Sequence, residues 1–208
     1  MPNKTFLELD EEKKAKIFEA ALEEFASHGY EKSSTNQIVK ECGISKGSLF
    51  KYFENKDDLY FYLIETVALE ITAYIKDRTK FEGKDFKESI IEYSKAEISF
   101  YIENPLKGRF MIRLAYDRRD VEEKIHKRFG NLSRNVYTEF MKDTRFKGKA
   151  TTKEVSDVVF WVLKGYIEKF LGENDCTKLQ LDKLKKKYVD GLSTYLDIIF
   201  KGACPEKN

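Results

Sequence analysis

The sequence predicts an all-α fold of about nine helices, in which an amino-terminal helix-turn-helix precedes a larger carboxy-terminal helical region. Prolines and glycines, the strongest helix breakers, number only 3 and 11 among 208 residues. Helix-start signals recur along the chain, each a small polar residue followed one turn later by Glu, Asp or Gln. Between these signals the apolar residues keep helical spacing, and no segment shows the alternating pattern of a strand.

The expected helices follow these signals in order. The first lies within residues 12–28, where Ile17, Ala21 and Phe25 form an apolar stripe, and Gly29 is expected to end it as a left-handed cap. Further helices are expected over residues 56–78, 86–103, 121–144, 152–171 and 178–201, with a short one over residues 105–116. The start pairs are Ser34–Gln37, Asn55–Asp58, Asp85–Glu88, Asp120–Glu123, Thr151–Glu154 and Thr177–Gln180.

Two short helices joined by a glycine turn are predicted between Ser34 and Phe53. The segment TNQIVKEC stops at Gly43, where a left-handed backbone lets the chain reverse, and Ser45 is placed to cap the segment KGSLFKYF. In the second helix we expect Leu49, Phe50 and Phe53 in the core. The side chains expected to point outward are those of Lys46, Ser48, Lys51 and Tyr52. This arrangement is typical of a helix-turn-helix.

The charge of this segment favours nucleic acid as its partner. Residues 32–56 hold five lysines and two acidic residues, although the formal charge of the whole chain is only +2. Lysine and tyrosine side chains neutralise and hydrogen-bond phosphates, which gives an affinity that falls steeply with salt. Gly47 lies at the exposed start of the second helix, where a missing side chain permits close approach to the groove of DNA.

Residues 12–60 resemble the DNA-binding domain of the TetR family of bacterial transcription regulators. The resemblance rests on Ile17-Phe18, Ala20-Ala21, Phe25, Gly29-Tyr30, Ser33-Ser34, Ile38, GISKGSLFKYF, Asn55-Lys56 and Leu59. It implies a DNA-binding domain over residues 1–58, a ligand-binding and dimerisation domain over residues 59–208, and a role in ligand-responsive regulation, usually repression. It also implies phosphate contacts by Ser33, Ser34, Tyr52 and Lys56, and contacts to bases or the groove edge by Asn36, Lys46, Gly47, Ser48 and Lys51.

The second region is rich in aromatic residues, most of which are expected to pack a helical core. Several carry polar groups that orient a mostly apolar ligand. The hypothesis is a pocket for a small-molecule effector, touched by some of Phe110, Tyr116, Tyr137, Trp161 and Tyr166.

The last two long helices carry more apolar surface than one subunit readily covers. The last helix has a coiled-coil-like seam of Leu181, Leu184, Tyr188, Leu192, Tyr195 and Ile199, and Val158 and Val162 lie on the helix before it. Pairing of these helices with a second copy predicts a homodimer held by a four-helix bundle, as the resemblance implies. An intrachain core is the alternative for about half of these positions.

Other classes of protein are less well supported. Cys42, Cys176 and Cys204 form no CxxC pattern, the two histidines lack partners at ligand spacing, and no catalytic motif is present. We therefore expect neither an enzyme nor a metal or other cofactor. With no long apolar run and no signal peptide, we expect a cytoplasmic protein without a membrane partner. A helical adaptor that binds only proteins explains the aromatic residues but not the basic helix-turn-helix.

Overall fold

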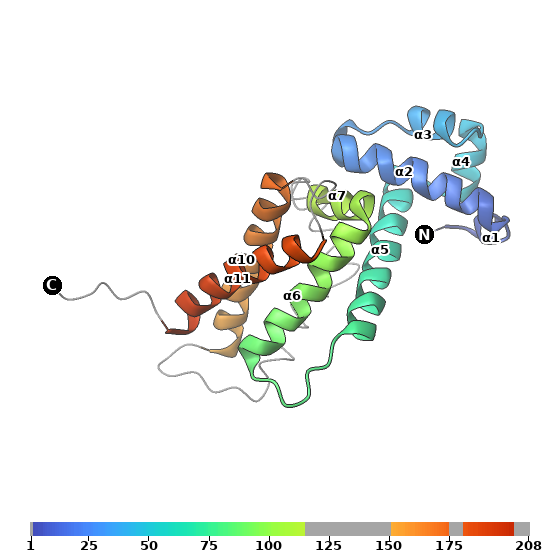
Figure 1. Ribbon diagram of the computed structural model, residues 1–208. Coiled ribbons are helices and arrows are strands. Elements are labelled where there is room, and N and C mark those ends of the chain that lie inside the picture. Colours follow the sequence, from blue (N-terminus) through green and yellow to red (C-terminus); the bar gives the residue numbers. More distant parts are fainter. Residues whose placement is uncertain (1, 115–150, 175–180, 202–208) are drawn as a thin grey trace. The chain divides into compact units, whose positions relative to one another are not determined.

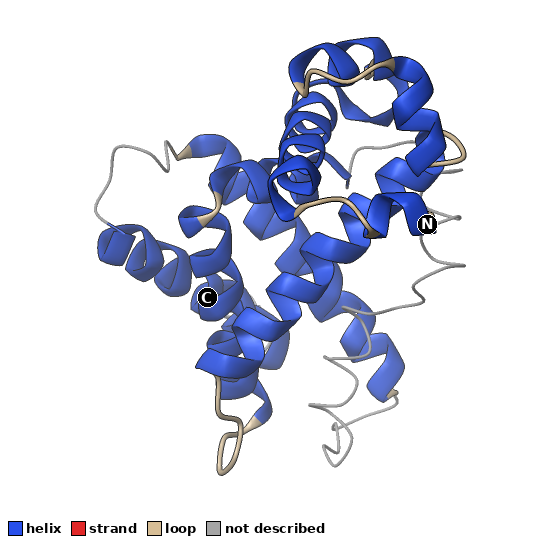
Figure 2. Cartoon of the chain, turned by 90° about the vertical axis from the view of Figure 1, so that its right-hand side faces the viewer, coloured by secondary structure: helices blue, strands red, loops and turns tan. Residues whose placement is uncertain are grey.

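The computed structural model describes residues 2–114, 151–174 and 181–201 (Figure 1). Within these ranges every regular element is a helix and no strand occurs (Figure 2), so the predicted all-α class is confirmed. The helices are α1 (Lys4–Leu7), α2 (Glu11–Lys32), α3 (Thr35–Glu41), α4 (Lys46–Tyr52), α5 (Lys56–Arg78), α6 (Phe86–Glu103), α7 (Pro105–Leu114), α10 (Thr152–Glu173) and α11 (Leu181–Lys201).

The predicted bounds of α5 and α6 are confirmed, and α10 ends two residues later than predicted. The predicted end of α7 at residue 116 lies outside the described residues. The predicted helix over residues 121–144 lies outside the described residues. The short helix α1 was not predicted. It is capped by Asn3, whose side-chain oxygen accepts a 3.2 Å hydrogen bond from the backbone N–H of Phe6.

Side-chain caps begin most of the predicted helices. The Asn55 side chain accepts from the N–H of Asp58 at 2.9 Å, and Thr151 and Glu154 form a complete capping box. Asp85 and Glu88 also bond each other's backbone N–H groups. The expected cap by the Ser34 side chain is wrong, because that side chain accepts no capping hydrogen bond. The pairs that start at Asp120 and Thr177 lie outside the described residues.

Two glycines, Gly43 and Gly29, shape the backbone between α2 and α4. Gly43, with φ of 69°, makes the turn between α3 and α4, and the N–H of Ile44 reaches back to the carbonyl of Val39 at 3.0 Å. Gly29 interrupts the first helix with a positive φ of 70°, as expected, although its ψ of 174° is not that of a left-handed cap. The helix has a kink at this residue, and a further helical stretch within α2 continues to Lys32.

The described residues form two compact units. The first holds residues 2–73 and 104–114, so α7 belongs with α1 to α4 and most of α5. Its α7 packs along α2, Phe110 is buried against Tyr60 with ring centres 5.6 Å apart, and Arg109 pairs with Glu23 at 2.9 Å. The predicted functional boundary after residue 58 remains a prediction.

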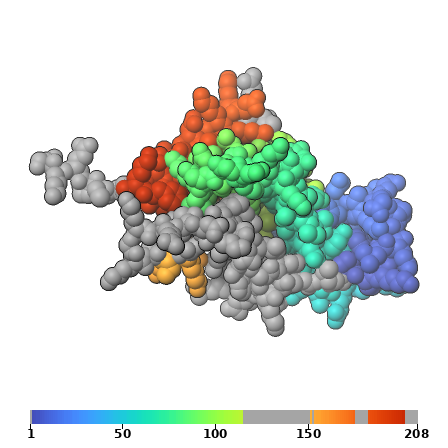
Figure 3. Space-filling view, turned by 90° about the horizontal axis from the view of Figure 1, so that it is seen from below, coloured from blue at the N-terminus to red at the C-terminus, as the bar shows by residue number. Residues whose placement is uncertain are grey.

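The second unit holds residues 74–103, 151–174 and 181–201. Its α11 packs against α6 and α10, and Figure 3 shows the surfaces of α6 (green) and α11 (red) in contact. One side of α11 is fully buried in this packing, through Leu184, Tyr188, Leu192 and Leu196. Lys87 and Asp197 form a 2.8 Å ion pair between α6 and α11.

Candidate nucleic-acid interface

Helix α4 is anchored on one side and open on the other. Its amino-terminal end is capped by Ser45, whose hydroxyl oxygen accepts from the N–H of Ser48 at 3.0 Å. Leu49 and Phe53 are buried as predicted, each with 1% of its surface exposed. The exposed positions include Lys46, Gly47 and Lys51, whereas Ser48 is half-buried. The helix therefore presents two lysines and a glycine outward from a packed base.

The expected directions of two aromatic side chains of α4 are wrong. Phe50, expected in the core, is 40% exposed, and Tyr52, expected to point outward, is only 7% exposed. The unpredicted helix α1 explains the burial of Tyr52, since Phe6 packs edge-on against its ring at 6.0 Å. The backbone N–H of Asn3 also donates to the carbonyl of Tyr52 at 2.9 Å. Phe50 lies one helical turn after Lys46, so its exposed ring becomes a further candidate for the interface.

The residues before α3 divide into buried and exposed positions. Ser33 is 8% exposed, and its hydroxyl donates to the carbonyl of Tyr30 at 2.8 Å, so it is engaged inside the fold. Ser34 and Asn36 are exposed. The backbone N–H of Ser34 donates to the carboxylate of Glu24 at 2.8 Å, and Glu24 itself is buried. This carboxylate thus ties the start of α3 to α2.

Lys56 connects the first turn of α5 to the end of α2. Its ammonium group donates to the carbonyl of Ser33 at 2.7 Å and lies 4.8 Å from the ring centre of Tyr30. The Tyr30 hydroxyl in turn donates to the carboxylate of Asp57. The family resemblance implies a phosphate contact by Lys56, and in the structure its ammonium group makes these intramolecular contacts.

Three of the residues predicted to touch an effector lie in the described part of the chain, one in the first unit and two in the second. Phe110 is buried in the first unit, and Trp161 is 61% exposed on α10. The hydroxyl of Tyr166 donates to the carbonyl of Tyr188 at 3.1 Å, and its ring lies against the space left by Gly191, so Tyr166 packs α10 on α11. Tyr116 and Tyr137 lie outside the described residues.

The residues of the predicted dimer seam include both buried and exposed positions. Leu184, Tyr188 and Leu192 are buried within the chain, as the intrachain alternative anticipated. Val158 and Tyr195 are 41% and 40% exposed. Val162 and Ile199 are half-buried, and the side chain of Leu181 lies outside the described part. Two further apolar residues missed by the seam, Trp161 and Ile198, are exposed on the same two helices.

Among the described residues no three His, Cys, Asp or Glu side chains gather at distances suited to a metal ion. None of the described helices combines the length and apolar content that a membrane span requires. Burial raises the pKa of the Cys42 thiol, the free cysteine described in the first unit.

Comparison with known proteins agrees with this geometry. Residues 17–63 match the family model of bacterial regulatory proteins of the tetR family. A similar relative is the HTH-type transcriptional regulator SAB2452 of Staphylococcus aureus, 30% identical over 102 residues, which cover 49% of this chain and 52% of the relative. The chain therefore spans about half the length of this curated relative.

Solved structures resemble the fold over nearly the whole chain. A TetR-family transcriptional regulator from Chloroflexus aurantiacus has a TM-score of 0.73 at 22% identity, covering 97% of this chain and 98% of its own. The transcriptional regulator FadR from Bacillus subtilis, solved in complex with stearoyl-CoA, has a TM-score of 0.66 at 19% identity, covering 92% and 100%.

The capped, outward-facing α4 and the glycine turn before it define a helix-turn-helix protein of all-α class. Residues 17–63 match the tetR family of bacterial regulatory proteins, in agreement with the resemblance described from the sequence. The helices beyond this segment share the fold of solved family members.

Proposed function

We propose that this chain is a transcriptional regulator that inserts α4 into the major groove of operator DNA. The observation that carries the proposal is the orientation of α4. Its buried side fixes the helix through Leu49 and Phe53, while Lys46, Gly47 and Lys51 are exposed together on the opposite side. A rigid helix with a basic, sterically open outer side is suited to groove binding.

The exposed side chains suggest how sequence is read. The chain has no arginine before Arg78, so bidentate arginine contacts to guanine are unavailable in this segment. We assign hydrogen bonds with base edges to Asn36 and Lys46, and apolar contact with thymine methyl groups to Phe50. Ser34, Ser48 and Lys51 are assigned to the phosphates and the groove edge. Ser33, Tyr52 and Lys56 are reassigned from phosphate contacts to positioning of the two helices.

The proposed assembly is a homodimer that places two copies of α4 about 34–36 Å apart, one turn of DNA. Its interface is formed by the exposed apolar residues of α10 and α11, which are Val158, Trp161, Tyr195 and Ile198. An exposed tryptophan is a costly surface residue in a monomer and a frequent anchor of interfaces.

The regulatory input is proposed to be a small, mostly apolar molecule whose binding to the second unit releases the operator. The regulator FadR from Bacillus subtilis was solved with stearoyl-CoA, so a long-chain acyl-CoA is the first effector to test. Release requires that the effector prefer the released form by a few kcal/mol. Repression is the proposed sign of regulation because it is usual in the family.

The test begins with selection of bound sequences from a pool of random DNA duplexes, followed by fluorescence anisotropy at several salt concentrations. We expect affinity to fall steeply with salt, and Lys46→Ala to change the preferred sequence. Lys76→Ala, an exposed lysine on α5, is the matched control and leaves both affinity and preference unchanged. Absent or salt-independent DNA binding would instead favour a protein-binding adaptor. If Lys46→Ala weakens binding to all DNA sequences equally, Lys46 does not contact base edges.

A further inference from the structure

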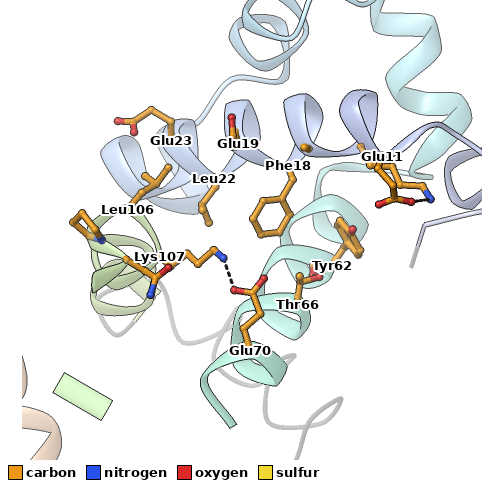
Figure 4. A pocket seen from close by; sticks show the side chains of 14 residues that line it. Glu11, Phe18, Glu19, Leu22, Glu23, Tyr62, Thr66, Glu70, Leu106 and Lys107 are labelled. Carbon is orange, nitrogen blue, oxygen red and sulfur yellow. Dashed lines mark hydrogen bonds and ion pairs between the residues drawn. The ribbon is translucent and has the colours of Figure 1, made fainter. Parts of the chain in front are cut away.

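A cavity of about 620 Å³ opens between α2, α5 and the start of α7, entirely within the first unit (Figure 4). None of the residues predicted to contact an effector lines it. One face of α2 forms the upper wall in the figure, Tyr62, Thr66 and Glu70 of α5 form a second wall, and the segment from Asn104 to Lys107 closes the third.

The interior of the cavity is apolar and aromatic. Phe18 projects from α2 toward Tyr62 of α5, and the two rings meet edge to face with centres 6.2 Å apart. Leu22 and Leu106 line the side nearer α7. Burial raises the pKa of Tyr62, so its hydroxyl stays neutral at physiological pH. This surface is suited to the hydrocarbon or aromatic part of a small molecule.

The charges around the cavity favour a cation. Four glutamates and two lysines line it. Both lysines are already neutralised, Lys14 by Glu11 at 2.8 Å and Lys107 by Glu70. Glu19 is exposed, and no ion pair links it to another described residue. Glu23 is paired with Arg109 at 2.9 Å, so the excess negative charge at the rim is that of Glu19. An anionic ligand would be repelled by this charge, whereas a cationic one would reduce it.

The position of Lys107 shows where such a cation fits. Its ammonium group contacts the Glu70 carboxylate and lies 6.0 Å from the ring centre of Phe18, so a carboxylate and an aromatic ring face the same point (Figure 4). Both partners stabilise positive charge. The pair is partly solvated, with 25% and 39% of the two side chains exposed, so separating it costs little.

We propose that this cavity is a binding site for a hydrophobic organic cation, whose charged group replaces the ammonium of Lys107 beside Glu70 and Phe18. The apolar part of the ligand lies along Phe18, Leu22 and Tyr62. Lys107 acts as an internal competitor that occupies the cation position when the ligand is absent.

The probe is phenylbutylammonium, compared with phenylbutanol and phenylbutanoate, which share its apolar part and differ in head-group charge. Binding to the full chain is measured by calorimetry and by chemical-shift changes, without DNA. Failure of this site is therefore distinguishable from failure of the proposed DNA binding. We expect the ammonium compound to bind tightest of the three.

Two substitutions should act in opposite directions. Glu70→Gln, which keeps the side-chain shape, should weaken binding of the ammonium compound by about threefold to tenfold and leave that of the alcohol unchanged. Lys107→Met removes the competing charge while keeping most of the apolar stem, and should strengthen binding of the ammonium compound. Circular dichroism and thermal unfolding establish that both variants are folded.

The control is the ion pair between Lys87 and Asp197 in the second unit, whose side chains are similarly exposed at 28% and 35%. Lys87→Met should leave binding unchanged. The proposal is overturned if the three compounds bind alike, if the carboxylate binds tightest, if none binds, or if a folded Glu70→Gln variant keeps the affinity of the unsubstituted chain.

Discussion

The ammonium group of Lys56 donates a 2.7 Å hydrogen bond to the backbone carbonyl of Ser33, a residue 23 positions earlier in the chain. This bond joins the first turn of α5 to the residue that follows α2, and the ring of Tyr30 covers the same charge at 4.8 Å. With the bond from the Ser34 N–H to Glu24, it fixes both sides of the entry into the helix-turn-helix.

We expect Lys56→Met to lower the free energy of unfolding by about 1–2 kcal/mol, because it removes a charged hydrogen bond and a cation–π contact. The dependence of DNA affinity on salt should keep its slope, since a positioning residue releases no counterions from DNA. Chemical denaturation and anisotropy titrations measure the two quantities.

The matched variant Lys51→Met should behave in the opposite way, with unchanged stability and a salt slope shallower by about 0.9 for a lost phosphate contact. If Lys56→Met also makes the slope shallower, Lys56 contacts phosphate as the sequence originally suggested, and its reassignment is wrong.

Gly47 and Gly43 should separate a binding role from a folding role. A Cβ at Gly47 would meet only the Ser45 hydroxyl at 3.8 Å, so Gly47→Ala should leave stability unchanged and weaken DNA binding by crowding the groove. Gly43 has φ of 69°, so Gly43→Ala should cost about 1 kcal/mol of stability through backbone strain alone. Unchanged DNA affinity in Gly47→Ala would show that the glycine does not face DNA.

Trp161 tests the proposed homodimer. Trp161→Glu should shift the chain from dimer to monomer in sedimentation velocity at micromolar concentration, because a charge in a buried interface loses its hydration. Leu69→Glu is the control, since Leu69 is similarly exposed at 65% but lies on α5. A dimer that tolerates Trp161→Glu would place the interface elsewhere, and a monomeric parent chain would refute it.

Glu97 should make stability depend on pH. Its low-polarity surroundings raise the pKa from 4.5 to about 7, although part of the residue remains accessible and the Tyr101 hydroxyl, at 3.3 Å, favours the charged form. The folded chain therefore binds a proton more tightly than the unfolded chain. The stabilisation is complete below about pH 4.5 and is lost as the pH rises to about 7.

A pKa rise from 4.5 to about 7 corresponds to about 3 kcal/mol for a fully buried group, and the partial exposure of Glu97 reduces the expected loss to about 2 kcal/mol. Glu97→Gln should remove this part of the pH dependence and be the more stable form at pH 8, measured by denaturation across a pH series. An identical pH dependence in the two chains would contradict the assignment to Glu97.

Local sequence was sufficient for the helices and for the helix-turn-helix. The bounds of α5 and α6, the turn at Gly43 and the caps at Ser45, Asn55 and Thr151 all depend on residues within one or two turns of each other. Apolar periodicity and capping are local effects, so they can be predicted from the amino-acid sequence.

The directions of individual side chains could not be predicted from the sequence, because they depend on residues distant in the chain. Tyr52 is buried by Phe6 of α1, Lys56 is held by Ser33, and Tyr188 is covered within its own chain. Periodicity ranks positions as apolar or polar but does not say which neighbour covers them. The cavity beside Lys107 is lined by helices far apart in the chain, so only the tertiary structure defines it. The exposure of Trp161 and the burial of the residues that anchor α4 depend on tertiary packing in the same way.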